Sequence, residues 1–85
     1  MLNKPVSRAE AVNWCIEHVA VLLDVPATDI QPHKPFSELG LDSATAVYFI
    51  VEIEGWLGIE LTPEVVYEHP SIDALVDFLI AEPKH

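Results

Sequence analysis

The chain has 85 residues and a formal net charge of −10 at pH 7. This length predicts one domain, residues 1–85, with one small hydrophobic core. Nucleic acids and anionic membranes bind basic surfaces, so the acidity excludes both and favours protein partners with basic patches. The longest apolar run, Ala46–Val51, is too short to cross a bilayer. The single cysteine, Cys15, excludes an internal disulfide framework and predicts a cytoplasmic protein.

A first helix is predicted from a capping box and an apolar periodicity. Ser7 and Glu10 have the spacing at which a serine and a glutamate cap a helix start reciprocally. The apolar side chains that follow recur at helical spacing and predict one buried face, widened by Ala11, Cys15 and Leu22: Val12, Ile16, Val19 and Leu23. Asp24, Val25 and Pro26 end this helix, because a residue before proline avoids helical angles.

A long loop, residues 26–40, connects the first two helices. Loops of this length are uncommon unless they are functional or held by their own side chains. We expect a helical turn from Phe36 to Leu39 within it. Four apolar side chains are the expected anchors of the loop on the core: Val25, Ile30, Phe36 and Leu39.

The second helix is predicted over residues 43–57 and the remaining helices follow closely. Its core face consists of side chains at helical spacing: Ala46, Phe49, Ile50, Ile53 and Leu57. Gly58 is suited to a left-handed helix end. Thr62 and Pro63 predict the cap and first residue of a short helix that ends before Pro70, and Ser71 is the expected cap of the last helix. The ordered part is predicted to cover about residues 7–81, with both termini loose.

One stretch before the second helix has the features of a site. Asp42 is expected to cap that helix, which places Ser43 in the first turn. Free backbone N–H groups and the helix dipole favour a phosphate ester at such a position. On these two residues alone, an ordinary helix start explains the pattern equally well.

The wider pattern resembles the acyl carrier proteins, in particular the polyketide-synthase type. The similarity includes Leu39-Gly40-Leu41-Asp42-Ser43 with Phe36 before it, and it continues through Leu61-Thr62-Pro63, residues 66–72, Leu75 and Leu79. The resemblance implies an all-α bundle of three longer helices and one short helix. It also implies that Ser43 carries 4′-phosphopantetheine as a phosphodiester, while Gly40, Leu41 and Asp42 shape the attachment site. The arm's thiol would then hold acyl or polyketide intermediates as thioesters.

Partners follow from the same resemblance. A phosphopantetheinyl transferase would load Ser43 from coenzyme A with Mg²⁺, so the chain itself is expected to be non-catalytic. A ketosynthase, an acyltransferase or a thioesterase would then meet an apolar stripe with an acidic border: Ala44, Val47, Tyr48, Val51, Glu52, Glu54, Glu64 and Val65. The family usually has a larger aliphatic residue in place of Ala44, and its fatty-acid members often have a glutamate where Tyr48 stands. Both departures favour a secondary-metabolite pathway over fatty-acid synthesis.

Three alternatives remain open at this stage. A peptidyl or aryl carrier of a non-ribosomal peptide pathway shares the Asp-Ser pair, although many such sites read Gly-Gly-His-Ser rather than Gly-Leu-Asp-Ser. An unmodified helical adaptor needs the docking surface but not Ser43. An enzyme would need a base beside Ser43 and a pocket that excludes water, and a metal centre would need ligands at matched spacing; neither pattern is evident. We expect a monomer, and Met1 with the short ends suggests a free-standing protein, although an excised synthase domain looks the same.

Overall fold

Three longer helices form the body of the computed structural model, which describes residues 6–80. They are α1 (Arg8–Leu23), α3 (Ser43–Leu57) and α5 (Ile72–Ile80). Short elements lie in the connections: the 3₁₀ helix η1 (Ala27–Asp29), α2 (Phe36–Leu39) and α4 (Val65–Glu68). The predicted all-α bundle is therefore confirmed, including the helical turn within the long loop. The predicted loose termini and the end of the ordered core at residue 81 lie outside the described residues.

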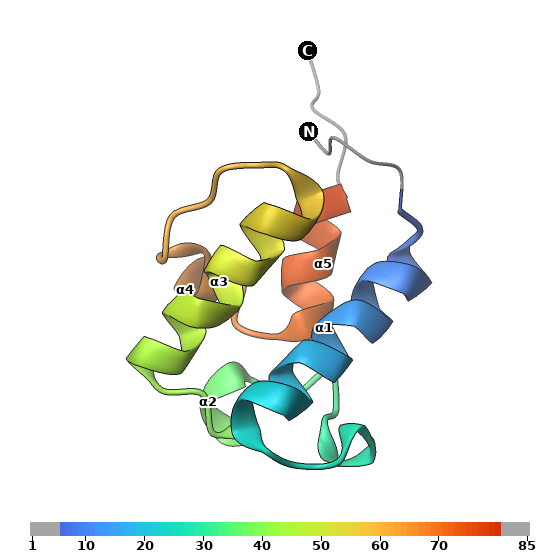
Figure 1. Cartoon of the computed structure of the whole chain (residues 1–85), viewed down its shortest axis with the longest axis vertical. Coiled ribbons are helices and arrows are strands. Elements are labelled where there is room, and N and C mark those ends of the chain that lie inside the picture. The colour runs from blue at the N-terminus through green and yellow to red at the C-terminus, as the bar shows by residue number, and fades with distance from the viewer. Residues whose placement is uncertain (1–5, 81–85) are drawn as a thin grey trace.

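The helices are arranged so that α1 runs opposite to α3 and α5 (Figure 1). α1 packs against both α5 and α3. The start of α3 consequently lies at the same end of the bundle as the last turn of α1 and the whole of α2 (Figure 1). The long loop closes this end.

The predicted ends of the three longer helices form as expected. The Ser7 hydroxyl accepts a hydrogen bond from the Glu10 N–H (3.1 Å), and the Glu10 carboxylate accepts one from the Ser7 N–H (3.3 Å). Gly58 ends α3 in the left-handed conformation, with φ of 67°. The Ser71 hydroxyl accepts from the Ala74 N–H (3.2 Å) at the start of α5. These local signals fix where the three long helices begin or end.

The buried face of α1 is shifted from the predicted one, although Val19 at its centre and Ala11 and Cys15 at its edge are buried as predicted. Small residues line it, and they are Ala11, Cys15, Val19 and Ala20. The other side chains expected at its centre, those of Val12, Ile16 and Leu23, are only half-buried. Small residues let α1 approach its neighbours closely, which displaces the larger side chains to the edges of the contact.

Aromatic side chains close the seam between α1 and α3. Trp14 stacks on Trp56 of α3, with ring centroids 4.3 Å apart, and on His18 of its own helix at 3.6 Å. A nitrogen of the His18 ring also lies 3.0 Å from the Trp14 carbonyl oxygen, which can only accept, so that nitrogen donates. This stack explains why Trp14 does not follow the apolar face of α1.

The centre of the core is shared by α3 and α5. Its largest fully buried side chains include an aromatic ring and five aliphatic groups: Phe49, Ile53, Leu57, Ile72, Leu75 and Leu79. Three of them lie on α5, and they are Ile72, Leu75 and Leu79. The closely packed side chains of α3 and α5 therefore support the loop that precedes α3.

Backbone hydrogen bonds hold the long loop against the segment before α5. The Phe36 N–H donates to the Pro70 carbonyl (2.7 Å), and the Asp73 N–H donates to the Pro32 carbonyl (3.0 Å). Ile30 and Phe36 are buried anchors as predicted, and Leu39 packs partly against the core. Val25 is not an anchor, because its side chain is 37% exposed.

The short helix α4 starts two residues later than predicted. Pro63 and Glu64 form a turn, and the helix covers only residues 65–68. Thr62 contributes its carbonyl to the Val65 N–H (3.1 Å), but no side-chain cap is formed. The apolar start of the helix, Val65 and Val66, is buried in the core. Burial of this pair, rather than a side-chain cap, places α4.

Candidate functional site

Ser43 is positioned by a chain of contacts that begins at the buried Phe36 ring. That ring meets the Phe49 ring edge to face, with centroids 5.8 Å apart. The Gly40 N–H and the Leu41 N–H both donate to the Phe36 carbonyl, which folds the chain back at the end of α2. Leu41 is then buried against the core, and Ser43 begins α3. The reactive stretch is thus anchored on both sides by apolar side chains.

Gly40 permits the turn because its φ is 102°, a conformation that L-residues rarely adopt. A Cβ atom at this position would have nothing within 4 Å, so the cost of a side chain is conformational rather than steric. Gly40→Ala should lower the free energy of unfolding by about 1–2 kcal/mol. Gly55 is the matched control, because it lies inside α3 with the same open surroundings. Gly55→Ala should raise stability by up to about 1 kcal/mol.

Urea unfolding of both glycine variants gives the comparison directly. Opposite signs are expected, since alanine is strained at one position and favoured at the other. Equal effects of the two substitutions would contradict the role of Gly40 in holding the turn.

Asp42 caps α3 as the sequence predicts. Its carboxylate accepts a hydrogen bond from the Thr45 N–H (2.8 Å), and the backbone at Asp42 is extended. Hydrogen bonds from the N–H groups of Thr45 and then Ala44 lower the pKa of this carboxyl below its usual value. The cap is therefore present at neutral pH, and its contribution to stability is lost only as the pH falls through that lowered pKa.

Ser43 lies exposed in the first turn of α3 and borders a groove of about 360 Å³. The first ladder bond of the helix runs from the Ala46 N–H to the Asp42 carbonyl (2.9 Å), and the Thr45 N–H before it donates to the Asp42 carboxylate. The groove is lined by residues of α2, the start of α3, α4 and the segment after α4: Phe36, Ser37, Leu41, Asp42, Ser43, Ala46, Val66, Tyr67 and Pro70. The groove is mostly apolar, with hydroxyl groups at Ser37 and Tyr67.

These features fit a phosphodiester on the Ser43 hydroxyl. The positive end of the helix dipole at the start of α3 favours the negative phosphate. The adjoining groove is within the size range of small-molecule sites, about 300–1,000 Å³, and it offers apolar walls to a flexible arm. Of the four predicted attachment residues, Leu41, Asp42 and Ser43 line the groove, and Gly40 forms the turn before them.

The groove is the part of the site that sequence reasoning missed. Ser37, Tyr67 and Pro70 line the same groove as Ser43, and the long loop that carries Ser37 is hydrogen-bonded to the segment before α5. No local pattern reports such a contact between segments about thirty residues apart. The repeated prolines of the loop are the one relevant sequence signal, because they restrict the backbone and favour a loop with one conformation.

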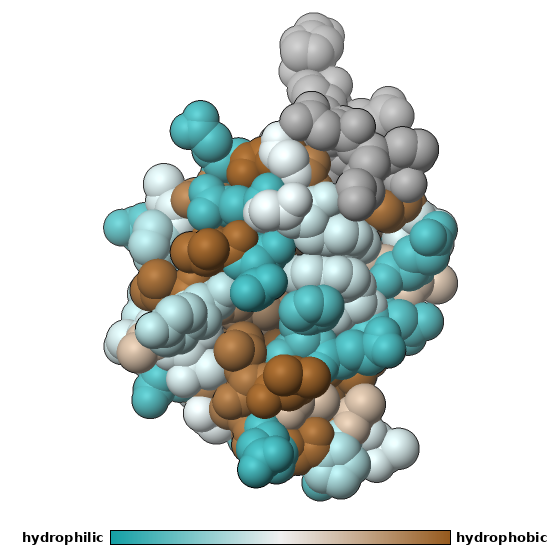
Figure 2. Space-filling model, in the orientation of Figure 1, coloured by the Kyte–Doolittle hydropathy of each residue, from teal (hydrophilic) through white to brown (hydrophobic). Residues whose placement is uncertain are grey.

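The residues predicted to meet partners lie mostly on the outer face of α3. Val47, Tyr48 and Val51 are 43%, 66% and 56% exposed, and Ala44 and Glu52 are exposed beside them. Hydrophobic side chains are visible over α3 in Figure 2. Because residues 44, 47, 48 and 51 share one helical face, they form a continuous apolar stripe. Glu64 is exposed before α4.

Two of the predicted partner residues are placed differently. Val65 is only 3% exposed, so its side chain belongs to the core and is not available for docking. Glu54 is half-buried, and its carboxylate accepts a hydrogen bond from the Leu61 N–H (2.8 Å). Glu54 therefore holds the connection after α3, and a charge reversal there would disturb the fold as well as any docking. Glu52 is the better probe of the acidic border.

Two of the described histidines, His18 and His69, stack on aromatic side chains. His18 stacks on Trp14, and His69 stacks on Phe78 with centroids 4.3 Å apart. Within residues 6–80, no group of three or more histidine, cysteine or acidic side chains could hold a metal ion. No helix in the same range is long and apolar enough to cross a membrane.

Comparison with known families identifies the same region. Residues 13–79 match the family described as "Phosphopantetheine attachment site". The acyl carrier protein TtuC of Teredinibacter turnerae is 30% identical over 81 residues, which cover 95% of this chain and 93% of that protein. The spectinabilin polyketide synthase system protein NorB of Streptomyces orinoci is 37% identical over 79 residues. That match covers 91% of this chain but only 4% of NorB. This chain likewise spans only 3% of the length of a matching mycobacterial polyketide synthase subunit.

Solved structures show the same bundle. A free-standing peptidyl carrier protein from Acinetobacter baumannii superposes with a TM-score of 0.84 at 28% identity, over 87% of this chain and 92% of that one. An acyl carrier protein from Anabaena, with a variant phosphopantetheinylation-site sequence, gives a TM-score of 0.80 at 32% identity, over 93% and 90%. With its helical bundle, its exposed serine at a capped helix start and these matches, the chain belongs to the phosphopantetheine-binding family of carrier domains and is homologous to the acyl carrier domains of polyketide synthases.

Proposed function

We propose that Ser43 is the attachment residue and that the chain carries acyl intermediates in polyketide-type biosynthesis. The exposed hydroxyl of Ser43, at a capped helix start and beside an apolar groove, is the observation that supports this proposal. When bound, 4′-phosphopantetheine supplies a thiol on a long arm, and that thiol holds an acyl chain as a thioester.

The residues of the site prepare Ser43 for loading by a separate phosphopantetheinyl transferase. Gly40 and the buried Leu41 fix the turn, and Asp42 fixes the first turn of α3 through Thr45. The Ser43 oxygen forms the new bond to phosphorus, its proton passes to a base of the transferase, and the remainder of coenzyme A leaves. Mg²⁺ and catalytic groups belong to the transferase, so this chain acts as a substrate.

The polyketide assignment is supported by the relatives rather than by the fold. The peptidyl carrier from Acinetobacter baumannii has the same bundle, so the architecture does not discriminate between the two cargo classes. The named sequence relatives, in contrast, are polyketide synthases and an acyl carrier protein. We therefore assign an acyl cargo in preference to an aminoacyl one.

The outer face of α3 is the proposed surface for pathway enzymes such as a ketosynthase, an acyltransferase or a thioesterase. Its apolar stripe, defined by Ala44, Val47, Tyr48 and Val51, lies next to the first turn that holds Ser43. Glu52 on α3 and Glu64 just before α4 are exposed acids that would attract a basic rim on such an enzyme. This arrangement would bring an enzyme to the serine without covering it.

The proposal is tested by incubating the protein with coenzyme A, Mg²⁺ and a broad-specificity transferase. Intact mass should rise by one phosphopantetheinyl group. The thiol of the attached arm should appear at the same time as the one fast-reacting thiol. Cys15 does not compete with it, because burial makes Cys15 inaccessible and raises its pKa to about 12. The apo protein, folded by circular dichroism, is the control and should show no fast-reacting thiol.

A folded protein that gains no mass with this transferase or with that of its native host would contradict the proposal. A mass gain without a new fast-reacting thiol would also contradict it, since the arm would then not end in an accessible thiol.

A further inference from the structure

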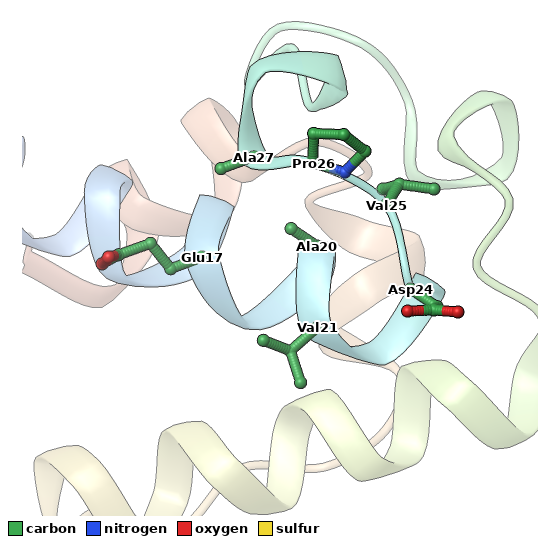
Figure 3. A pocket seen from close by; sticks show the side chains of 7 residues that line it. All are labelled: Glu17, Ala20, Val21, Asp24, Val25, Pro26 and Ala27. Atoms are coloured by element: carbon green, nitrogen blue, oxygen red, sulfur yellow. The ribbon is translucent and has the colours of Figure 1, made fainter.

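A second apolar surface lies at the end of α1. There a hollow of about 630 Å³, open to solvent, is formed by the last two turns of α1 and the start of the long loop. Its lining is shown in Figure 3: Glu17, Ala20, Val21, Asp24, Val25, Pro26 and Ala27. Val21 is 78% exposed, the most exposed of the large hydrophobic side chains in residues 6–80. Figure 2 shows a hydrophobic patch over this lower end of the molecule.

Acidic side chains flank the apolar centre in a regular way. Glu17 and Val21 lie one turn apart on the same face of α1, and Asp24 follows as the residue that ends the helix. Glu17 and Asp24 are both exposed, and they lie on opposite sides of Ala20 and Val21 in Figure 3. The helical stretch from Glu17 to Leu23 corresponds to about 9 Å along the axis, and Asp24 follows it directly, so the two acids lie on either side of one apolar position.

The end of α1 is fixed, so the hollow is preformed. Asp24 adopts the left-handed conformation with φ of 56° and ends the helix. The N–H of Asp24 donates to the Val21 carbonyl (3.2 Å), and that of Val25 donates to the Ala20 carbonyl (3.0 Å). Ala20 itself is 5% exposed and forms the floor. Docking at this surface needs little ordering of the backbone.

The charge of the surface decides between occupants. No lysine or arginine lines the hollow, and of the two basic residues in the described part, Arg8 is already paired with Asp73 and Asp77 on α5. A second copy of the chain would bring acids against acids, and an anionic lipid surface would be repelled in the same way. A partner with positive charges on both sides of an apolar group matches the pattern.

We propose that this hollow docks a helix of a protein partner that presents one aliphatic side chain between two Lys or Arg residues seven positions apart. The aliphatic group packs on Ala20 beside Val21 and Val25, and the two cations meet Glu17 and Asp24. Since the hollow lies on α1 and the loop that follows it, this surface is separate from the apolar stripe of α3. The proposal does not depend on Ser43 being modified.

The test uses a stapled helical peptide of about 16 residues with Arg at two positions seven apart and Leu midway, because short unstapled helices are marginal in water. It is titrated into the ¹⁵N-labelled full chain at low salt, and amide shifts are followed. We expect the largest shifts in residues 17–27. Glu17→Gln with Asp24→Asn should raise the Kd at least about five-fold, since two surface ion pairs are removed. Asn is chosen because it tolerates the left-handed conformation at position 24.

Variants on α3 provide matched controls. Val21→Ser should weaken binding several-fold, whereas Val51→Ser, at the comparably exposed position on α3, and Glu52→Gln should leave the Kd within two-fold. A peptide with Leu replaced by Ser should bind more weakly. Shifts centred on α3, equal effects of Val21→Ser and Val51→Ser, or no binding by the folded chain would each overturn the proposal. Failure of Ser43 loading would not affect this outcome, so the two proposals fail independently.

Discussion

Ser43→Ala is expected to abolish phosphopantetheine loading completely. The variant lacks the oxygen that forms the bond to phosphorus, and no neighbouring group can replace it, so intact mass should stay at the apo value after prolonged incubation with transferase, coenzyme A and Mg²⁺. The helix start should survive, because the cap is formed by Asp42 and Thr45 rather than by the Ser43 side chain. Circular dichroism should therefore be unchanged.

Ser37 offers a control within the same groove. It is exposed, it lines the groove that Ser43 borders, and it lies on α2. Ser37→Ala should load to the same extent as the wild type. Loading of Ser43→Ala, or loss of the mass gain in Ser37→Ala, would assign the attachment to a different hydroxyl.

Phe49→Ala is expected to give the largest loss of stability among single core substitutions near the site. The Phe49 ring is fully buried and packs edge to face against the Phe36 ring. Removing it should cost about 3–5 kcal/mol, a large part of the about 5–15 kcal/mol that stabilises a typical domain. Urea unfolding measures this loss. Because Phe36 anchors the loop before Ser43, the transferase should also load this variant more slowly.

Val51→Ala is the control for Phe49→Ala. Val51 is on the same helix but faces outward, so the variant's free energy of unfolding should differ from that of the wild type by no more than about 0.5 kcal/mol. A similar loss in both variants would mean that the two faces of α3 are not distinguished as the structure describes.

The sequence was informative wherever a feature depends on nearby residues. The capping box at Ser7 and Glu10, the Asp42 cap and the left-handed Gly58 are each decided by hydrogen bonds within one turn. Such contacts need no knowledge of the rest of the fold. The start of α3, which matters most for Ser43, could be predicted to the residue for this reason.

Faces of helices were less predictable where apolar residues surround the axis. On α1, two neighbouring stripes are both apolar, so periodicity could not select between Val12 and Ala11 as the buried position. The choice depends on how closely α5 and α3 approach, which is a property of the packed bundle. The same argument applies to Val65, where four helical residues are too few to define a face.

Hydrogen bonds between separate elements could not be predicted from local patterns. The bond from the Leu61 N–H to Glu54 changes an expected surface acid into a structural one, and nothing in the local sequence marks it. The bond from the Phe36 N–H to Pro70 likewise completes the groove beside Ser43. Both features follow from the path of the chain after α3 rather than from a residue pattern.

The bonds between the long loop and the segment before α5 bear on when the protein becomes competent during synthesis. Phe36 and Pro32 obtain their partners from Pro70 and Asp73, which a ribosome adds more than thirty residues later. A nascent chain that ends before Pro70 contains Ser43 but lacks both bonds and the Pro70 wall of the groove, so the site that it offers a transferase is incomplete. Translation order thereby favours loading of finished domains over truncated ones.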